Sequence, residues 1–159
     1  MALEGGSVSS EPVSQLSHRA KLFQARADLV DACPFLGFLA LKMPVLITND
    51  GHTTTASVDG RGVCRIDQTF LDSLRVSDLK TVLLHEVLHL ALDAFGRQNA
   101  RDPWLWNVAH DHAVNLLIEE VESPFESAFT WPDGIQPLMD KAFKGLSAEV
   151  IYEKLLGKA

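Results

Sequence analysis

The chain has 159 residues, of which 47% are hydrophobic, and its formal net charge at pH 7 is −7. This length and composition suffice to bury one sizeable core, so we expect one compact domain over residues 16–157. The excess of acidic side chains argues against nucleic acids and anionic membranes as partners, because both are negatively charged themselves.

The first segment, residues 1–15, is small and polar, and we expect a flexible tail that carries no chemistry. It has neither the basic nor the apolar region of a signal peptide, and no stretch of the chain reaches transmembrane length. We therefore expect a cytoplasmic protein. Cys33 and Cys64 are too few for a disulfide framework and do not form a CxxC pair, so we expect both to be reduced.

Two helices are predicted next. Residues 16–32 have a helical composition that Pro34 ends, and residues 35–43 add a short apolar helix. The side chains expected to share one face of the first helix are Ala20, Phe23, Ala27 and Val30.

Three short β-prone runs follow, at residues 45–48, 53–58 and 63–66, separated by Asn-Asp-Gly and Asp-Gly-Arg-Gly turn signals. They predict a small meander. An edge strand beside a cleft can pair with an extended peptide, and Val63 to Ile66 is the candidate for such docking. The simpler alternative is an ordinary edge strand that binds nothing.

The most informative feature is the pentapeptide His85-Glu86-Val87-Leu88-His89, which has the HExxH form of a zinc peptidase site. Residues four apart on a helix lie on one face, so His85 and His89 can bind the same metal ion. Glu86, beside them, can deprotonate a water that zinc activates. The alternative is a core helix whose histidines happen to lie one turn apart.

The helix around this motif should be buried, because almost every other residue from Leu79 to Phe95 is apolar. Buried imidazoles and carboxylates are costly unless they are paired or bind metal, which favours the metal site. Ser77 is the predicted N-cap, and Gly96 the predicted end. Asp93 is a candidate hydrogen-bond partner of His89 or an ordinary solvated aspartate.

A third metal ligand must come from elsewhere, because the positions where a metzincin carries Gly and a third His hold Leu92 and Phe95. The source that we expect is the next helix, residues 104–118, which Asp102 caps and Pro103 begins.

His110, Asp111 and His112 on this helix can all bind zinc, but neighbouring helical positions diverge by about 100°, so only one should face the metal. Periodicity does not choose between them. The spacing Asp111-x-x-x-Asn115 resembles the Glu-x-x-x-Asp of gluzincins, in which the acid binds zinc and the second residue orients a zinc-bound His. It favours Asp111, with His110 and His112 as the alternatives.

The C-terminal part of the chain begins with an irregular loop over residues 119–137, which either walls a cleft or only connects elements. Ser147 is the predicted cap of a final helix over residues 148–156. Tyr152 in this helix is expected to be a packed core residue rather than an oxyanion stabiliser.

Four separated segments of the chain resemble one family. They are Cys33–Gly37 with Leu39–Leu41, Leu83–Leu90, Trp106–Ala109 with Asp111 and Asn115, and Gly145–Tyr152. In this order they resemble the putative metallopeptidase domain that usually precedes a von Willebrand factor A-like domain in bacterial proteins. The likeness extends from about Ser17 to Leu156.

The resemblance implies an α+β, zincin-like fold, in which a small antiparallel or mixed sheet packs against the HExxH helix and a second ligand-bearing helix. It also implies that His85, His89 and Asp111 bind Zn²⁺ and that Glu86 is the general base.

The expected function is therefore that of a zinc-dependent peptidase acting on a peptide or protein substrate. The alternative is a catalytically silent zinc-binding module that recognises or regulates a partner protein. Glu86 favours the peptidase, because a purely structural zinc site needs no base. A metal-free helical module is the third possibility.

Overall fold

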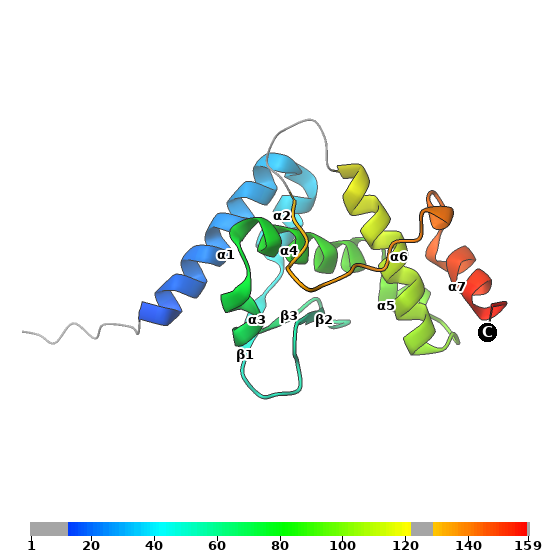
Figure 1. Ribbon diagram of the computed structural model, residues 1–159, viewed down its shortest axis with the longest axis horizontal. Helices are drawn as coiled ribbons and strands as arrows, with labels where there is room; N and C mark the ends of the chain where they lie inside the picture. Colours follow the sequence, from blue (N-terminus) through cyan, green and yellow to red (C-terminus); the bar gives the residue numbers. More distant parts are fainter. Residues whose placement is uncertain (1–12, 122–128, 159) are drawn as a thin grey trace, which may run out of the picture.

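The computed structural model describes residues 13–121 and 129–158, in which seven α-helices accompany a mixed three-stranded sheet (Figure 1). The predicted α+β class is confirmed. In chain order, the elements are α1 (Val13–Ala32), α2 (Pro34–Lys42), β1 (Val45–Thr48), β2 (Ala56–Val58), β3 (Cys64–Asp67), α3 (Gln68–Ser73), α4 (Val76–Ala91), α5 (Ala94–Arg97), α6 (Pro103–Val121), the 3₁₀ helix η1 (Lys141–Phe143) and α7 (Ala148–Leu156).

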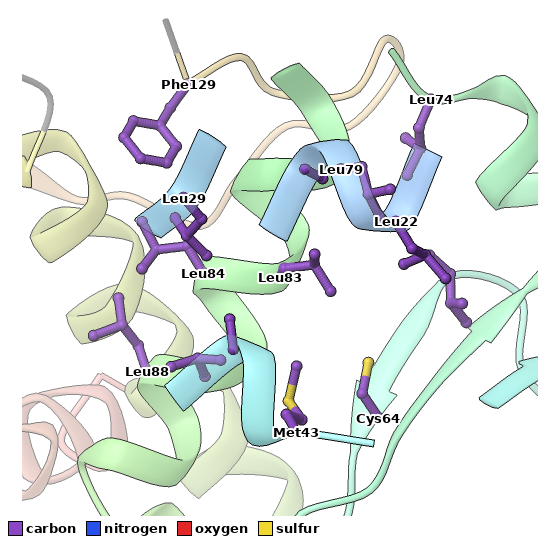
Figure 2. Close-up of a cluster of buried hydrophobic side chains, with 14 of the residues drawn as sticks. Leu22, Leu29, Met43, Cys64, Leu74, Leu79, Leu83, Leu84, Leu88 and Phe129 are labelled. Atoms are coloured by element: carbon purple, nitrogen blue, oxygen red, sulfur yellow. The ribbon is translucent and has the colours of Figure 1, made fainter. Parts of the chain in front are cut away.

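Helix α4, which carries the HExxH motif, lies at the centre and contacts α1, α2, α6 and β2 (Figure 1). Its Leu79, Leu83 and Leu84 are fully buried and pack with Leu22 and Leu29 of α1 (Figure 2). Burying one such leucine stabilises a fold by about 2 kcal/mol. The motif therefore lies on a helix that is packed at the centre of the core.

The buried face of α1 differs from the predicted one. Leu22, Ala25 and Leu29 face the core, whereas Phe23 is 73% exposed. Both sets have helical spacing, but only the face that carries Leu22 and Leu29 meets the leucines of α4. The helix also begins earlier than predicted, since residues 13–15 belong to it rather than to the tail; residues 1–12 of that tail lie outside the described residues.

The sheet has the order β1-β3-β2, which corrects the predicted meander. Strand β3 pairs in parallel with β1, with Val45 opposite Cys64, and antiparallel with β2, with Val58 opposite Cys64. Cys64 and Ile66 of β3 are fully buried, so the most deeply buried strand occupies the centre and leaves β1 and β2 at the edges.

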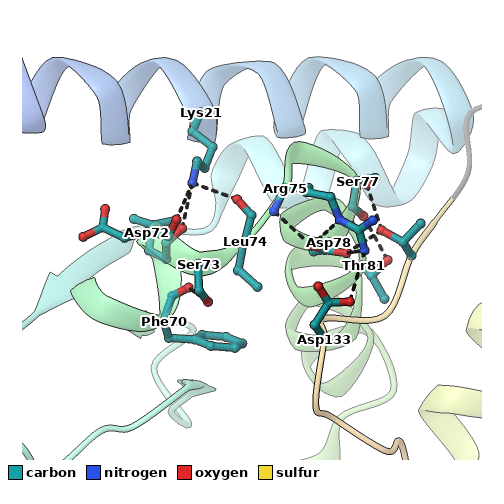
Figure 3. Close-up of polar contacts among 12 residues, drawn as sticks. Lys21, Phe70, Asp72, Ser73, Leu74, Arg75, Ser77, Asp78, Thr81 and Asp133 are labelled. Carbon is teal, nitrogen blue, oxygen red and sulfur yellow. Dashed lines mark hydrogen bonds and ion pairs between the residues drawn. The ribbon is translucent and has the colours of Figure 1, made fainter.

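Helix α4 begins at Val76, two residues earlier than a Ser77 cap would place it. Arg75 is the N-cap, and Asp78 in the first turn accepts hydrogen bonds from its backbone N–H at 2.9 Å and its Nε at 3.0 Å (Figure 3). Lys21 of α1 donates to the carbonyls of Leu71 and Leu74 at 2.8 Å each, which joins α1 to the turn before α4.

The end of α4 also differs from the prediction. The helix ends at Ala91, not near Gly96, because Asp93 has a left-handed backbone with φ of 51°. The Asp93 carboxylate caps α5 by accepting from the backbone N–H of Gly96 at 3.1 Å. Asp93 is therefore a helix cap and has no hydrogen bond to His89.

The C-terminal helix packs on α6 as a second small core. Ser147 caps α7 and accepts from the backbone N–H of Val150, as predicted. Tyr152 is 7% exposed, and its hydroxyl accepts from the backbone N–H of Asp102 at 3.1 Å, which confirms its packing role. Among residues 13–121 and 129–158, no helix is both long and apolar enough to cross a bilayer.

Candidate metal centre

Helices α4 and α6 bring together three potential metal ligands. The Nε2 atoms of His85 and His89 are 2.9 Å apart, and the Oδ1 atom of Asp111 lies 3.3 Å from the first and 3.0 Å from the second. In the described part of the chain, this is the one group of three His, Cys, Asp or Glu side chains close enough to share a metal ion. The helical spacing of the two histidines aims both rings at α6.

The residues fit a zinc ion by two criteria. A tetrahedral zinc with bonds of about 2.0–2.1 Å separates its ligand atoms by about 3.3 Å, close to the distances within this group. Two imidazole nitrogens and one carboxylate oxygen are also the donor set of many hydrolytic zinc sites, which keep a fourth position open. The two nitrogens and the carboxylate oxygen converge where His89 is buried and His85 and Asp111 are partly buried, and such a set of donors suits a cation.

The electrostatics of the group favour a bound cation. Burial alone would raise the pKa of Asp111, but hydrogen bonds with His85 and His89 outweigh it and hold that pKa well below its usual range. Burial alone would lower the pKa of His85, while the hydrogen bond with Asp111 and the charge of Glu86 raise it above the ordinary value. Asp111 is thus an anion at neutral pH, surrounded by imidazoles.

Glu86 lies beside the group and is only 6% exposed. Burial raises the pKa of its carboxyl above the usual value, against the opposing influence of His85 and His89. A carboxylate whose pKa is raised toward neutrality can accept a proton from water and return it. Glu86 lines the same cavity as His85 and Asp111, so it is placed to do this beside the three ligand atoms.

Asn115 orients one of the imidazoles from behind. Its Oδ1 lies 2.8 Å from the Nδ1 of His85, and its Nδ2 donates to the carbonyl of Leu138 at 3.1 Å. The second bond directs the amide oxygen toward His85, which must then donate from Nδ1. The structure thus shows the contact that the Asp-x-x-x-Asn spacing predicts.

The two other histidines of α6 point elsewhere. His110 lies behind His89, with their Nδ1 atoms 2.8 Å apart, and burial lowers its pKa to about 4. His112 faces the opposite side, where its Nδ1 accepts from the backbone N–H of Asp140 at 3.2 Å. Of the three candidates for the third ligand, the structure brings Asp111 to the two imidazoles. The contact of His110 with His89 has no counterpart in the predictions from the sequence.

A cavity of about 690 Å³ opens at the three ligand atoms. Strand β2, helices α4 and α6, and residues 131–138 all contribute to its wall. Residues 131–137 of the predicted loop therefore form part of the wall of the cleft. Residues 119–121 of that loop belong to α6 instead, and residues 122–128 lie outside the described residues. The large apolar side chains of the wall are Phe70, Val82, Phe95, Trp106, Trp131, Ile135 and Leu138.

The strand beside this cavity is not the predicted one. Residues 64–66 of the predicted strand belong to β3, which is hydrogen-bonded on both sides and offers no free edge to a peptide. Strand β2 is an edge strand, and Ala56, Ser57 and Val58 all line the cavity. Any strand pairing by a ligand in this cleft must therefore use β2.

Comparison with known proteins gives one match. The model of the family described as "Putative metallopeptidase domain" matches residues 17–159. No curated protein and no solved structure matches the chain.

Proposed function

The chain belongs to the putative metallopeptidase domain family, and on that premise we propose that it is a zinc-dependent peptidase. The observation that carries the proposal is the convergence of His85, His89 and Asp111 on one point of a cavity that Glu86 also lines. His85, His89 and Asp111 are the proposed zinc ligands, and Glu86 is the proposed general base.

When bound there, zinc would supply a Lewis acid that polarises the scissile carbonyl and acidifies a water molecule. The Glu86 carboxylate accepts the proton of the attacking water and then transfers it to the leaving nitrogen. Its raised pKa suits the first step, because a carboxylate of ordinary pKa is a weaker base toward water. Asn115 keeps His85 in the orientation that presents Nε2 to the cavity.

The proposed substrate is an extended peptide with apolar or neutral side chains. The free edge of β2 offers backbone groups to such a chain. No Lys or Arg is among the described residues that line the cavity, and the charged residues among them, Glu86 and Asp111, are assigned to catalysis and metal binding. Acidic substrate side chains would find no counter-charge among the described wall residues.

The direct test is Glu86→Gln, assayed with internally quenched peptides of varied sequence and with zinc content measured on the same samples. We expect turnover to fall by at least about 100-fold while zinc is retained, because the substitution removes the base and leaves the ligands intact. Glu153→Gln, the same change at an exposed position of α7, is the control and should keep full turnover.

The test also separates the proposed activity from the alternative of a silent module. Zinc-loaded wild-type protein that cleaves none of the peptides, or cleaves them no faster than Glu86→Gln, would contradict the peptidase. A zinc-binding module for partner recognition would then be the remaining function.

A further inference from the structure

His110 is a buried polar side chain beside the proposed ligands that the proposed mechanism does not use. It is 1% exposed and stacks on His89, with ring centroids 4.8 Å apart and an angle of 27° between the planes. Its Nδ1 lies 2.8 Å from the Nδ1 of His89, whereas its Nε2 is buried without a hydrogen-bond partner. A histidine that only filled the core would leave this polar atom at a cost that a phenylalanine avoids.

The contact between the two rings restricts where protons can lie. Two nitrogens 2.8 Å apart share one proton, since two bare nitrogens or two N–H groups would repel each other. If His89 is to present a bare Nε2 to a metal, its own proton must be on Nδ1. His89 then donates from Nδ1, and His110 accepts.

We propose that His110 is a positioning residue that holds His89 in the tautomer and ring orientation required for metal binding. The inference rests on the proposed zinc site. In this role His110 orients His89 as Asn115 orients His85. The acceptor atom lies 2.8 Å from the Nδ1 of the ligand histidine in each case. Helix α6 therefore supplies one ligand, Asp111, and the acceptors behind both of the others.

The burial of His110 supports this role. The ring is 1% exposed and stacks on the ring of His89, so its Nδ1 is kept facing the Nδ1 of His89. The neighbouring Trp106 ring, 5.6 Å away, is itself held by a 2.7 Å bond from its Nε1 to the carbonyl of Ala94. The Trp106 ring thus restrains His110, and His110 in turn restrains the ring of His89.

The test compares the zinc dissociation constants of four proteins by competition with a chromophoric chelator, with Zn²⁺ as the only added ligand. His110→Phe preserves a ring of similar size but removes the acceptor, and we expect zinc binding to weaken about 10–100-fold. His110→Asn returns an acceptor oxygen near the position of Nδ1 and should recover most of that loss. His112→Asn, two residues along α6, is the control and should leave zinc affinity unchanged, because its amide oxygen can still accept from the backbone N–H of Asp140.

Each variant is first shown to be folded by chemical unfolding in the presence of a chelator, and His110→Leu replaces His110→Phe if the latter does not fold. Wild-type affinity in folded His110→Phe or His110→Leu would overturn the inference and leave the proposed zinc site intact. An equal loss in His112→Asn would also overturn it, since the effect would then be general to the helix. Absence of zinc binding by the wild-type protein would refute the zinc site itself.

Discussion

Asn115 is the residue at which the sequence pattern and the structure agree most closely, since its amide joins His85 to the carbonyl of Leu138. We expect Asn115→Leu to weaken zinc binding about 10–100-fold, because His85 loses the acceptor that fixes its ring. Calorimetric titration with Zn²⁺ would measure this. Asn107→Leu, two turns earlier on the same helix, is the control; a comparable loss there would show that the effect is not specific to the bond with His85.

The residues of the site could be predicted where local spacing determines the geometry. Two histidines four positions apart on a helix must share a face, so the HExxH pentapeptide alone predicted that His85, His89 and Glu86 lie together. Asp111 could be chosen over His110 and His112 only because the spacing Asp111-x-x-x-Asn115 resembles the Glu-x-x-x-Asp of gluzincins. The role of His110 could not be predicted, because contact with His89 depends on how closely α4 and α6 approach, which periodicity does not encode.

At the scale of elements, the crossing of α1 and α2 depends on a glycine. A Cβ at Gly37 would lie 2.4 Å from the Cα of Val30 and 2.8 Å from the carbonyl carbon of Leu29. Both are backbone atoms that cannot rotate away, so the clash outweighs the higher helix propensity of alanine. We expect Gly37→Ala to lower the free energy of unfolding by about 2 kcal/mol, measured in urea.

The control for this substitution is Gly157→Ala at the end of α7, where the nearest atom to an added Cβ is 3.5 Å away. Its effect should stay within about 0.5 kcal/mol. Equal unfolding free energies for Gly37→Ala and the wild-type protein would mean that the two helices are not packed as closely as described.

The pair Arg97 and Glu149 joins α5 to α7 through two hydrogen bonds of 2.8 and 2.5 Å. The Arg97 guanidinium lowers the pKa of Glu149 to about 2. A carboxyl group whose pKa is lower in the folded protein stabilises the fold. For Glu149, this contribution is complete above the ordinary pKa of 4.5 and is lost as the pH falls toward 2. Because both side chains are about one-third exposed, we expect the contribution at pH 7 to be only about 1 kcal/mol.

The prediction is that Glu149→Gln unfolds at lower urea concentration than the wild-type protein at pH 7, and that this difference shrinks as the pH falls below 4.5. Glu153→Gln on the same helix is the control and should change little at either pH. A difference that stays constant down to pH 3 would show that the charge of Glu149 is not its cause.

The elements themselves were largely predictable, but their junctions and pairings were not. The cap residues Asp102 and Ser147 follow local rules, and both are confirmed. The early end of α4 depends on a left-handed aspartate, Asp93, in an otherwise helical run of apolar residues. The strand order depends on long-range pairing of β1 with β3, about which turn signals between neighbours carry no information.

At the scale of the whole molecule, residues 130–140 connect the site to distant parts of the chain. Thr130 donates its backbone N–H to the carbonyl of Ser77 at the start of α4, and Asp140 donates its own to His112 on α6. Between these two anchors, Leu138 fixes the amide of Asn115. Figure 1 shows this segment crossing in front of α4 toward η1. One wall of the cleft is therefore held by contacts that are far apart in sequence, which is why the loop could not be placed in advance.

The whole account depends on a metal ion joining α4 to α6. The most direct measurement is the metal content of the purified wild-type protein by elemental mass spectrometry, beside His85→Ala, Asp111→Ala and His112→Asn. The account predicts about one zinc per chain in the wild type, lost in the first two variants and retained in His112→Asn, whose amide oxygen can still accept from Asp140. A wild-type protein without metal after zinc is supplied, or full zinc content in His85→Ala and Asp111→Ala, would contradict it.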